Sequence, residues 1–139
     1  MNALSPTVLT GMVLVEGDAE GPAAVSPLPV SVARIDPDTG ILHEAGHPLD
    51  GCDLAGTILL CPTGKGSSSG SYVLLNLAHR KLAPAAIVTA QADAVLIAGA
   101  VLANIPLLTG CDPALLRSVA PGARLRVNGK TGTVSVQCN

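Results

Sequence analysis

The chain opens on alternating apolar and polar positions over residues 7–15, a pattern that is typical of a β-strand. A proline-rich passage at 21–29 follows, and two short apolar segments then flank the turn sequence at 36–40. We expect these segments, residues 30–35 and 41–43, to form a hairpin with a longer loop.

The pattern changes in the middle of the chain. Short apolar runs bounded by Gly or Pro are typical of buried strands, and they alternate with segments in which apolar residues recur at helical spacing. The strands are expected at 56–61, 84–89 and 106–109, and the helices at 68–82 and 93–102. The chain ends on apolar runs at 123–127 and 131–136 around an Asn-Gly turn, which predicts a second hairpin. The fold class is therefore α/β, with a central βαβαβ unit between β-rich ends.

Length and composition narrow the function. The 139 residues suit a single domain over residues 1–139. Charged residues make up 13% of the chain, against about 25% in ordinary soluble proteins, so we expect a partner to cover part of the surface. One aromatic residue and a net charge of -2 argue against nucleic-acid binding. The N-terminus lacks a secretory signal pattern, so the expected location is the cytoplasm.

Neither a metal site nor a membrane span is predicted. The four cysteines, at 52, 61, 111 and 138, have no neighbouring Cys or His at ligand spacing, so we expect reduced and mostly buried thiols. Residues 94–111 carry no charge, but Asn104 and Pro106 would interrupt a spanning helix.

Candidate chemistry gathers in one loop. The run Gly64-Lys-Gly-Ser-Ser-Ser-Gly-Ser71 follows a buried strand and precedes a helix, where free backbone N–H groups, a lysine and close backbone approach favour an anion. A flexible Gly/Ser loop with an ordinary helix cap is the alternative. A nucleotide P-loop is not supported, because Lys65 is followed by Gly66 and position 59 is Leu.

Five stretches resemble the small subunit, or swivel domain, of the aconitase X group of hydro-lyases. They are residues 47–49, 62–71, 83–86, 98–100 and 104–106, and the resemblance covers about residues 10–137. It implies a swivelling β/β/α domain, β-barrel-like with flanking helices. It also implies a heterodimer or larger complex with a large catalytic aconitase X subunit. The iron or iron–sulfur cluster would lie on that partner, with none bound by this chain.

The resemblance also assigns roles within the loop. Ser67 aligns with the serine that takes the substrate proton in the wider superfamily, and it directly follows Gly66 at the strand-to-helix transition; Ser68 is the alternative base. We expect Lys65, Gly66, Ser68 and Ser69 to bind the substrate. The loop arginine that binds substrate carboxylate in that superfamily is Ser69 here, so backbone N–H groups, Lys65 or the partner would replace it. Dehydration of a 3-hydroxy acid needs a base and a Lewis acid. This chain offers only the base, so it should be active only with its large subunit.

The substrate and one histidine stay open. A composition rich in Ala, Gly and Pro with three lysines favours cis-3-hydroxy-L-proline, with mevalonate 5-phosphate as the alternative. A binding or assembly module without catalysis is a further alternative. His47, next to a proline in a Gly-rich segment, is more often structural than a substrate or partner contact. No role is assigned to His43 or Glu44.

Overall fold

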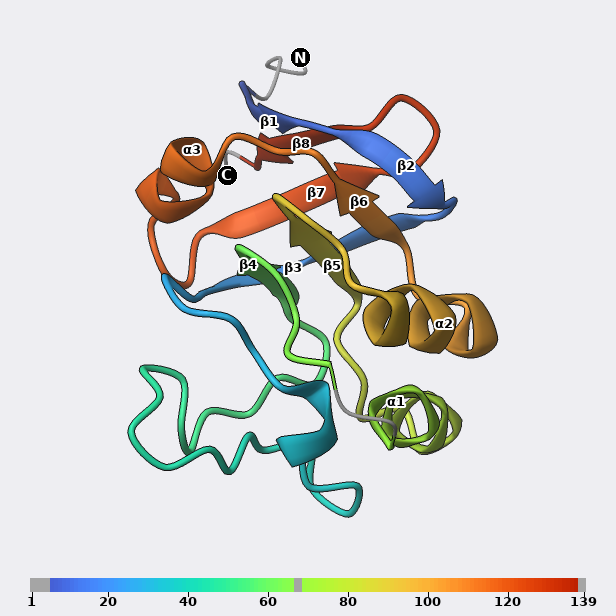
Figure 1. Cartoon of the computed structure of the whole chain (residues 1–139). Helices are drawn as coiled ribbons and strands as arrows, with labels where there is room; N and C mark the ends of the chain where they lie inside the picture. Colours follow the sequence, from blue (N-terminus) through green and yellow to red (C-terminus); the bar gives the residue numbers. More distant parts are fainter. Residues whose placement is uncertain (1–5, 67–68, 138–139) are drawn as a thin grey trace.

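A computed structural model of the chain describes residues 6–66 and 69–137. Within them, eight strands form one sheet that three α-helices and a short 3-10 helix flank (Figure 1). The strands are β1 (Thr7–Thr10), β2 (Met12–Val15), β3 (Asp18–Val25), β4 (Ile58–Cys61), β5 (Ala86–Thr89), β6 (Leu107–Thr109), β7 (Arg124–Asn128) and β8 (Thr133–Val136). The helices are η1 (Val32–Arg34), α1 (Gly70–His79), α2 (Ala94–Ala103) and α3 (Pro113–Ser118).

The sheet curls into a barrel-like shape because its first segment reaches both edges. The strand order is β1-β8-β7-β3-β4-β5-β6-β2, so β1 and β2, which adjoin in sequence, lie at opposite ends of the order. Gly11 separates them. A Cβ at Gly11 would lie 2.6 Å from the Thr109 carbonyl oxygen and 2.7 Å from the Cys111 Sγ, so the crossing has no room for a side chain. The predicted single strand over 7–15 is therefore split at this glycine.

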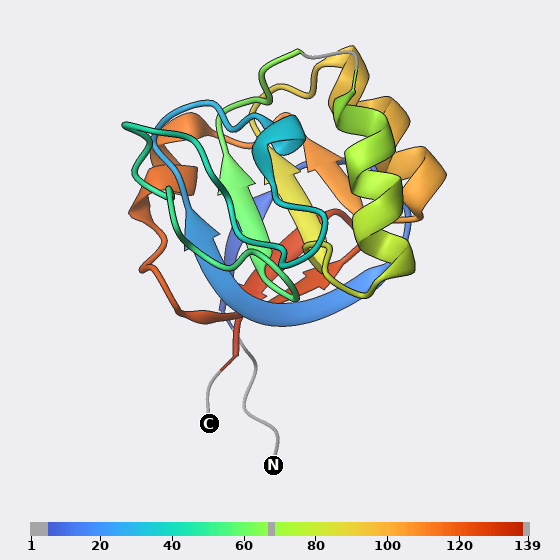
Figure 2. The ribbon, with the colours of Figure 1, turned by 90° about the horizontal axis from the view of Figure 1, so that it is seen from below.

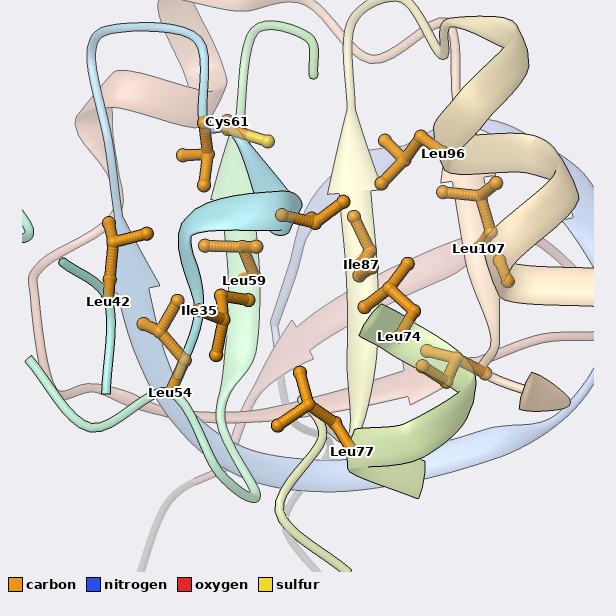
Figure 3. Packing of buried hydrophobic residues seen from close by; sticks show 14 residues of the cluster. Ile35, Leu42, Leu54, Leu59, Cys61, Leu74, Leu77, Ile87, Leu96 and Leu107 are labelled. Atoms are coloured by element: carbon orange, nitrogen blue, oxygen red, sulfur yellow. The ribbon is translucent and has the colours of Figure 1, made fainter. Parts of the chain in front are cut away.

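The central βαβαβ prediction is confirmed. Strand β4 pairs parallel with β5 and β5 with β6, with α1 and α2 as the crossovers. Alternate residues of β4 face opposite sides: Leu59 and Cys61 contact the helix layer, and Ile58 and Leu60 point into the barrel. All four are buried, which explains the unbroken apolar run of the sequence. Figure 3 shows Leu59 and Cys61 among the side chains on the helix side of the sheet.

Helices α1 and α2 lie side by side on one face of the parallel strands (Figure 2). Glycines set their separation. A Cβ at Gly99 of α2 would approach Leu74 Cδ1 to 2.7 Å and Ser71 Cα to 3.1 Å. At the start of α1, a Cβ at Gly70 would lie 2.8 Å from Val95 Cγ1. These small residues allow the two backbones to approach closely.

The N-terminal half departs from the sequence analysis at two places. Residues 21–25 of the proline-rich passage belong to β3, which pairs antiparallel with β7 as far as Pro22 and parallel with β4 from Ala23. Pro22 thus occupies the position at which the strand changes partners. The expected strand at 30–35 is largely the 3-10 helix η1, and one isolated bridge between Ile35 and Leu42 remains of the hairpin.

The second half of the chain follows the sequence more closely. Strands β7 and β8 form the predicted C-terminal hairpin. The charge-free segment 94–111 is divided into α2 and β6, with Asn104 in the left-handed conformation between them. None of the helices in the described parts of the chain is long and apolar enough to cross a membrane. Helix α3, which the sequence analysis did not predict, follows β6.

Candidate functional site

A cavity of about 690 Å³ opens between η1, the segment around Glu44 and the loop after β4. Its described lining combines two cationic side chains, one carboxylate, two serines and two alanines. They are Ser31, Ala33, Arg34, Glu44, Ala45, Lys65 and Ser69. The short alanine side chains leave the volume open, and the charged groups make it suited to a polar, ionised ligand.

The parallel strands position the loop at the edge of the sheet. Residues 62–66 follow the carboxyl end of β4, the edge at which ligands of open α/β sheets commonly bind. Val30 and Gly64 form a parallel bridge, and the Lys65 N–H donates to the Val30 carbonyl at 3.1 Å. A Cβ at Gly70 would lie 3.1 Å from Val32 Cγ2, so the start of α1 abuts η1. These contacts bring the loop and η1 to one cavity.

Lys65 forms an ion pair with Glu44. The Glu44 side chain is 12% exposed, and its second oxygen accepts the Ser31 N–H at 3.2 Å. Burial pushes the pKa of the Glu44 carboxyl upward, but the hydrogen bonds from Lys65 and Ser31 outweigh burial and hold the pKa below its usual value. Glu44 is therefore ionised at neutral pH, and it fixes Lys65 at the cavity wall.

Arg34 also lines the cavity, at the last position of η1. Its backbone is held by a hydrogen bond from its N–H to the Ser31 carbonyl at 3.0 Å and by one from the His43 N–H to its own carbonyl, also 3.0 Å. Among the described residues, its guanidinium has no hydrogen-bond or ion-pair partner. A fixed backbone thus carries an uncompensated positive charge at the cavity.

Asp93 lies behind the loop, at the N-cap of α2. A Cβ at Gly64 would lie 2.5 Å from its Oδ1 and one at Gly66 would lie 3.7 Å from its Oδ2, so the carboxylate packs against the loop backbone. Its Oδ1 is buried without a hydrogen-bond partner in the described parts of the chain. Gly64 is needed here because any side chain would displace Asp93.

The structure places the predicted substrate-binding residues unevenly. Lys65 and Ser69 line the cavity, and Gly66 is an exposed residue of the loop between them. Ser67, the predicted base, and Ser68 lie outside the described residues. Their roles therefore stay predictions, although the described residues on both sides of them lead to the same cavity.

His47 is held within the fold. The Leu49 N–H donates to its Nδ1 at 2.9 Å, so the ring proton is assigned to Nε2, which lies 3.0 Å from the Pro29 carbonyl oxygen and 3.2 Å from Ser26 Oγ. The side chain is buried and does not line the cavity. These contacts favour the structural interpretation, in which His47 joins the segments at 26–30 and 47–49.

The described residues do not fit a metal centre. Within residues 6–66 and 69–137, no group of three or more His, Cys, Asp and Glu side chains could hold an ion. Burial, followed by the charge of Asp93, raises the pKa of Cys61 to about 12, and burial raises that of Cys111 to about 11. Both are neutral thiols and poor ligands at neutral pH. Cys52 is exposed rather than buried, and Cys138 lies outside the described residues.

The sequence did not predict three polar residues of the cavity lining: Ser31, Arg34 and Glu44. Arg34 and Glu44 precede Lys65 by 31 and 21 positions, and no local motif links them to the loop. They lie near Lys65 only in the folded chain, where the bridge between Val30 and Gly64 joins the segment before η1 to the loop.

Comparison with known proteins identifies relatives of this site. The family model of the aconitase X swivel domain matches residues 8–136. The phosphomevalonate dehydratase small subunit of Pyrococcus furiosus is 41% identical over 129 residues, covering 92% of this chain and 94% of the relative. The protein of the same name from Methanosarcina acetivorans is 35% identical over 132 residues, covering 94% and 92%.

Structural comparison agrees. The holo-form crystal structure of Thermococcus kodakaraensis aconitase X matches with a TM-score of 0.87 and 36% identity, covering 96% of this chain and 99% of that chain. The resemblance seen in the sequence, the α/β swivel fold and the assignment to a hydro-lyase subunit are confirmed. The relatives carry the name of the substrate that the sequence analysis placed second, and the preference for cis-3-hydroxy-L-proline gains no support from them.

Proposed function

The chain belongs to the aconitase X swivel-domain family, and from that premise we propose that it is the small subunit of a dehydratase that acts on mevalonate 5-phosphate. The names of its relatives support this substrate. The cavity is compatible with it, because two cations against one carboxylate leave a net positive charge for an anionic ligand.

The proposed reaction removes the proton from the carbon next to the carboxylate and the hydroxyl from the adjacent carbon. Ser67, as its alkoxide, takes the proton, and the electron pair of the broken C–H bond forms the double bond. The C–O bond breaks and the hydroxyl leaves as hydroxide, so that the proton and the hydroxide together make up the water lost. A neutral serine is a weak base, so its alkoxide needs nearby donors or a cation. Lys65, held at the cavity by Glu44 and two residues from Ser67, supplies that charge.

The departing hydroxyl needs a Lewis acid, and the described residues of this chain form no site that could hold one. The proposed source is an iron or iron–sulfur centre on a large catalytic subunit. Exposed apolar side chains on α1 and α2 offer a surface for that partner: Tyr72 is 66%, Val101 59% and Leu102 53% exposed. Together with the low charge content, this apolar surface supports a protein partner as an integral part of the enzyme.

Reconstitution tests the proposal. This chain and the large subunit encoded in the same genome are purified separately, mixed and assayed with mevalonate 5-phosphate and with cis-3-hydroxy-L-proline. We expect dehydration of the phosphorylated compound by the mixture and none by either subunit alone. Turnover of cis-3-hydroxy-L-proline alone would overturn the proposed substrate. A stable complex without turnover of either compound would favour an assembly module.

A further inference from the structure

We propose that Arg34 is the specificity-determining residue of the cavity and that it binds the phosphate group of the substrate, an inference that rests on the proposed function. The sequence motif does not include Arg34. Its side chain lines the same cavity as Lys65 and Ser69, but it enters from η1 rather than from the loop.

Charge distinguishes Arg34 from the other cavity residues. Lys65 already pairs with Glu44, so Arg34 is the cationic residue of the described lining that has no carboxylate partner. Arg80 provides a contrast, because it pairs with Asp38 at 2.6 Å on the exposed surface. Arg34 instead lines the cavity, and in the described part of the chain its guanidinium has no carboxylate partner.

The Arg34 backbone is also preorganised for binding. The 3-10 turn and the His43 N–H fix the Arg34 backbone, so little backbone freedom is lost when a ligand binds. A guanidinium presents donors in a planar fork that matches two oxygens of a phosphate. The flanking Ala33 and the facing Ala45 leave space for such a group.

The proposed substrate has two anionic groups that need separate partners. A phosphorylated 3-hydroxy acid carries a carboxylate beside the reacting carbon and a phosphate at its far end. Lys65 pairs with Glu44 and is assigned to the base two positions further along the loop, so Arg34 is the remaining cationic residue of the described lining for the phosphate. Because Ser69 occupies the place of the superfamily's loop arginine, a guanidinium from η1 restores a second cationic position in the cavity.

Steady-state kinetics of the reconstituted complex test the assignment. Losing charge-assisted hydrogen bonds should raise the KM for mevalonate 5-phosphate roughly 10- to 100-fold in R34Q. The kcat should change much less, and R34K should recover part of the KM. Arg126→Gln, an exposed arginine of β7, is the matched control for net charge and should leave KM unchanged. Equal KM values in R34Q and R126Q would overturn the inference.

A binding measurement separates this inference from the proposed function. Inorganic phosphate is titrated into the isotope-labelled full chain, and NMR follows the Arg34 Nε–H signal together with the backbone N–H signals of Ser31 and Lys65, which line the same cavity and remain in R34Q. Saturable shifts that weaken with salt, persist in R126Q and vanish in R34Q support the anion site even if the complex turns over neither substrate. The anion site would be refuted if phosphate left the Arg34 signal unmoved and the R34Q complex had a normal KM. If the wild-type complex were active at the same time, the proposed function would still stand.

Discussion

Replacing Glu44 by Gln should destabilise the chain, and the loss should depend on pH. Gln keeps an oxygen for the Ser31 N–H but removes the charge that holds Lys65. Hydrogen bonds to charged groups are worth about 1.5–3 kcal/mol, but Lys65 is 51% exposed, so screening reduces the expected loss to about 1 kcal/mol. Glu44→Ala should cost about 1–2 kcal/mol more, because the Ser31 N–H then loses its acceptor.

The pH dependence follows from the lowered pKa of Glu44. Because the folded-state pKa lies below the usual value of 4.5, the stabilisation is fully present above pH 4.5 and is lost as the pH falls through the folded-state pKa. Urea unfolding of wild type and E44Q at several pH values measures it. The difference in unfolding free energy between wild type and E44Q should be largest at pH 7 and should shrink as the pH falls into the acid range.

Asp38→Asn is the matched control, since it removes one charge from the exposed pair with Arg80 and should change stability by less than about 0.5 kcal/mol. A Glu44→Gln variant as stable as wild type at pH 7 would refute the role given to the pair. So would a gap that stays constant from neutral to strongly acidic pH.

Two further predictions concern packing and thiols. Gly99→Val should lower the unfolding free energy, measured in urea, by about 2–3 kcal/mol, because the new Cβ would meet Leu74 and Ser71. Ala98→Val, on the exposed face of α2, should cost much less. Equal losses in the two variants would show that the contact between α1 and α2 is not tight. In a Cys138→Ser chain at pH 8, a thiol reagent should modify the exposed Cys52 rapidly. It should modify Cys61 and Cys111 only after unfolding, because burial keeps these two thiols protonated. Rapid reaction of all three thiols would contradict the burial of Cys61 and Cys111.

The central unit was predictable because its local signals agree with its packing. Strands buried on both faces appear as continuous apolar runs, and β4 is such a strand. Strand β3 was missed because Gly21 and Pro22 are typical of a turn. Here a Cβ at Gly21 would lie 2.2 Å from the Gly56 carbonyl oxygen, so the glycine serves close packing within a strand. Helix α3 had a usable signal: Asp112 caps it by accepting the Ala114 N–H at 2.8 Å, and Pro113 follows directly.

The site was predictable only on its loop side. The glycines and Lys65 lie together in sequence, and their chemistry can be inferred from it. The positions of Arg34 and Glu44 depend on η1. The sequence at 30–35 alternates between apolar and polar residues, which predicts a strand rather than this 3-10 turn. That turn places Val32 and Ile35, three residues apart, in the core and leaves Arg34 exposed at the cavity. Single-domain organisation over residues 1–139 and the role of Ser67 stay predictions.

The central claim is that this chain supplies the base to a dehydratase completed by its partner, and the kcat of a reconstituted complex carrying Ser67→Ala tests it most directly. Loss of a general base should lower kcat by about 100- to 10,000-fold. The variant should still bind the large subunit, and Ser71→Ala, at the start of α1, should stay near normal as the matched control. Near-normal turnover by Ser67→Ala, with activity lost in Ser68→Ala or Ser69→Ala, would move the base within the loop. Near-normal turnover by all three variants would contradict the claim that a serine of this chain takes the proton.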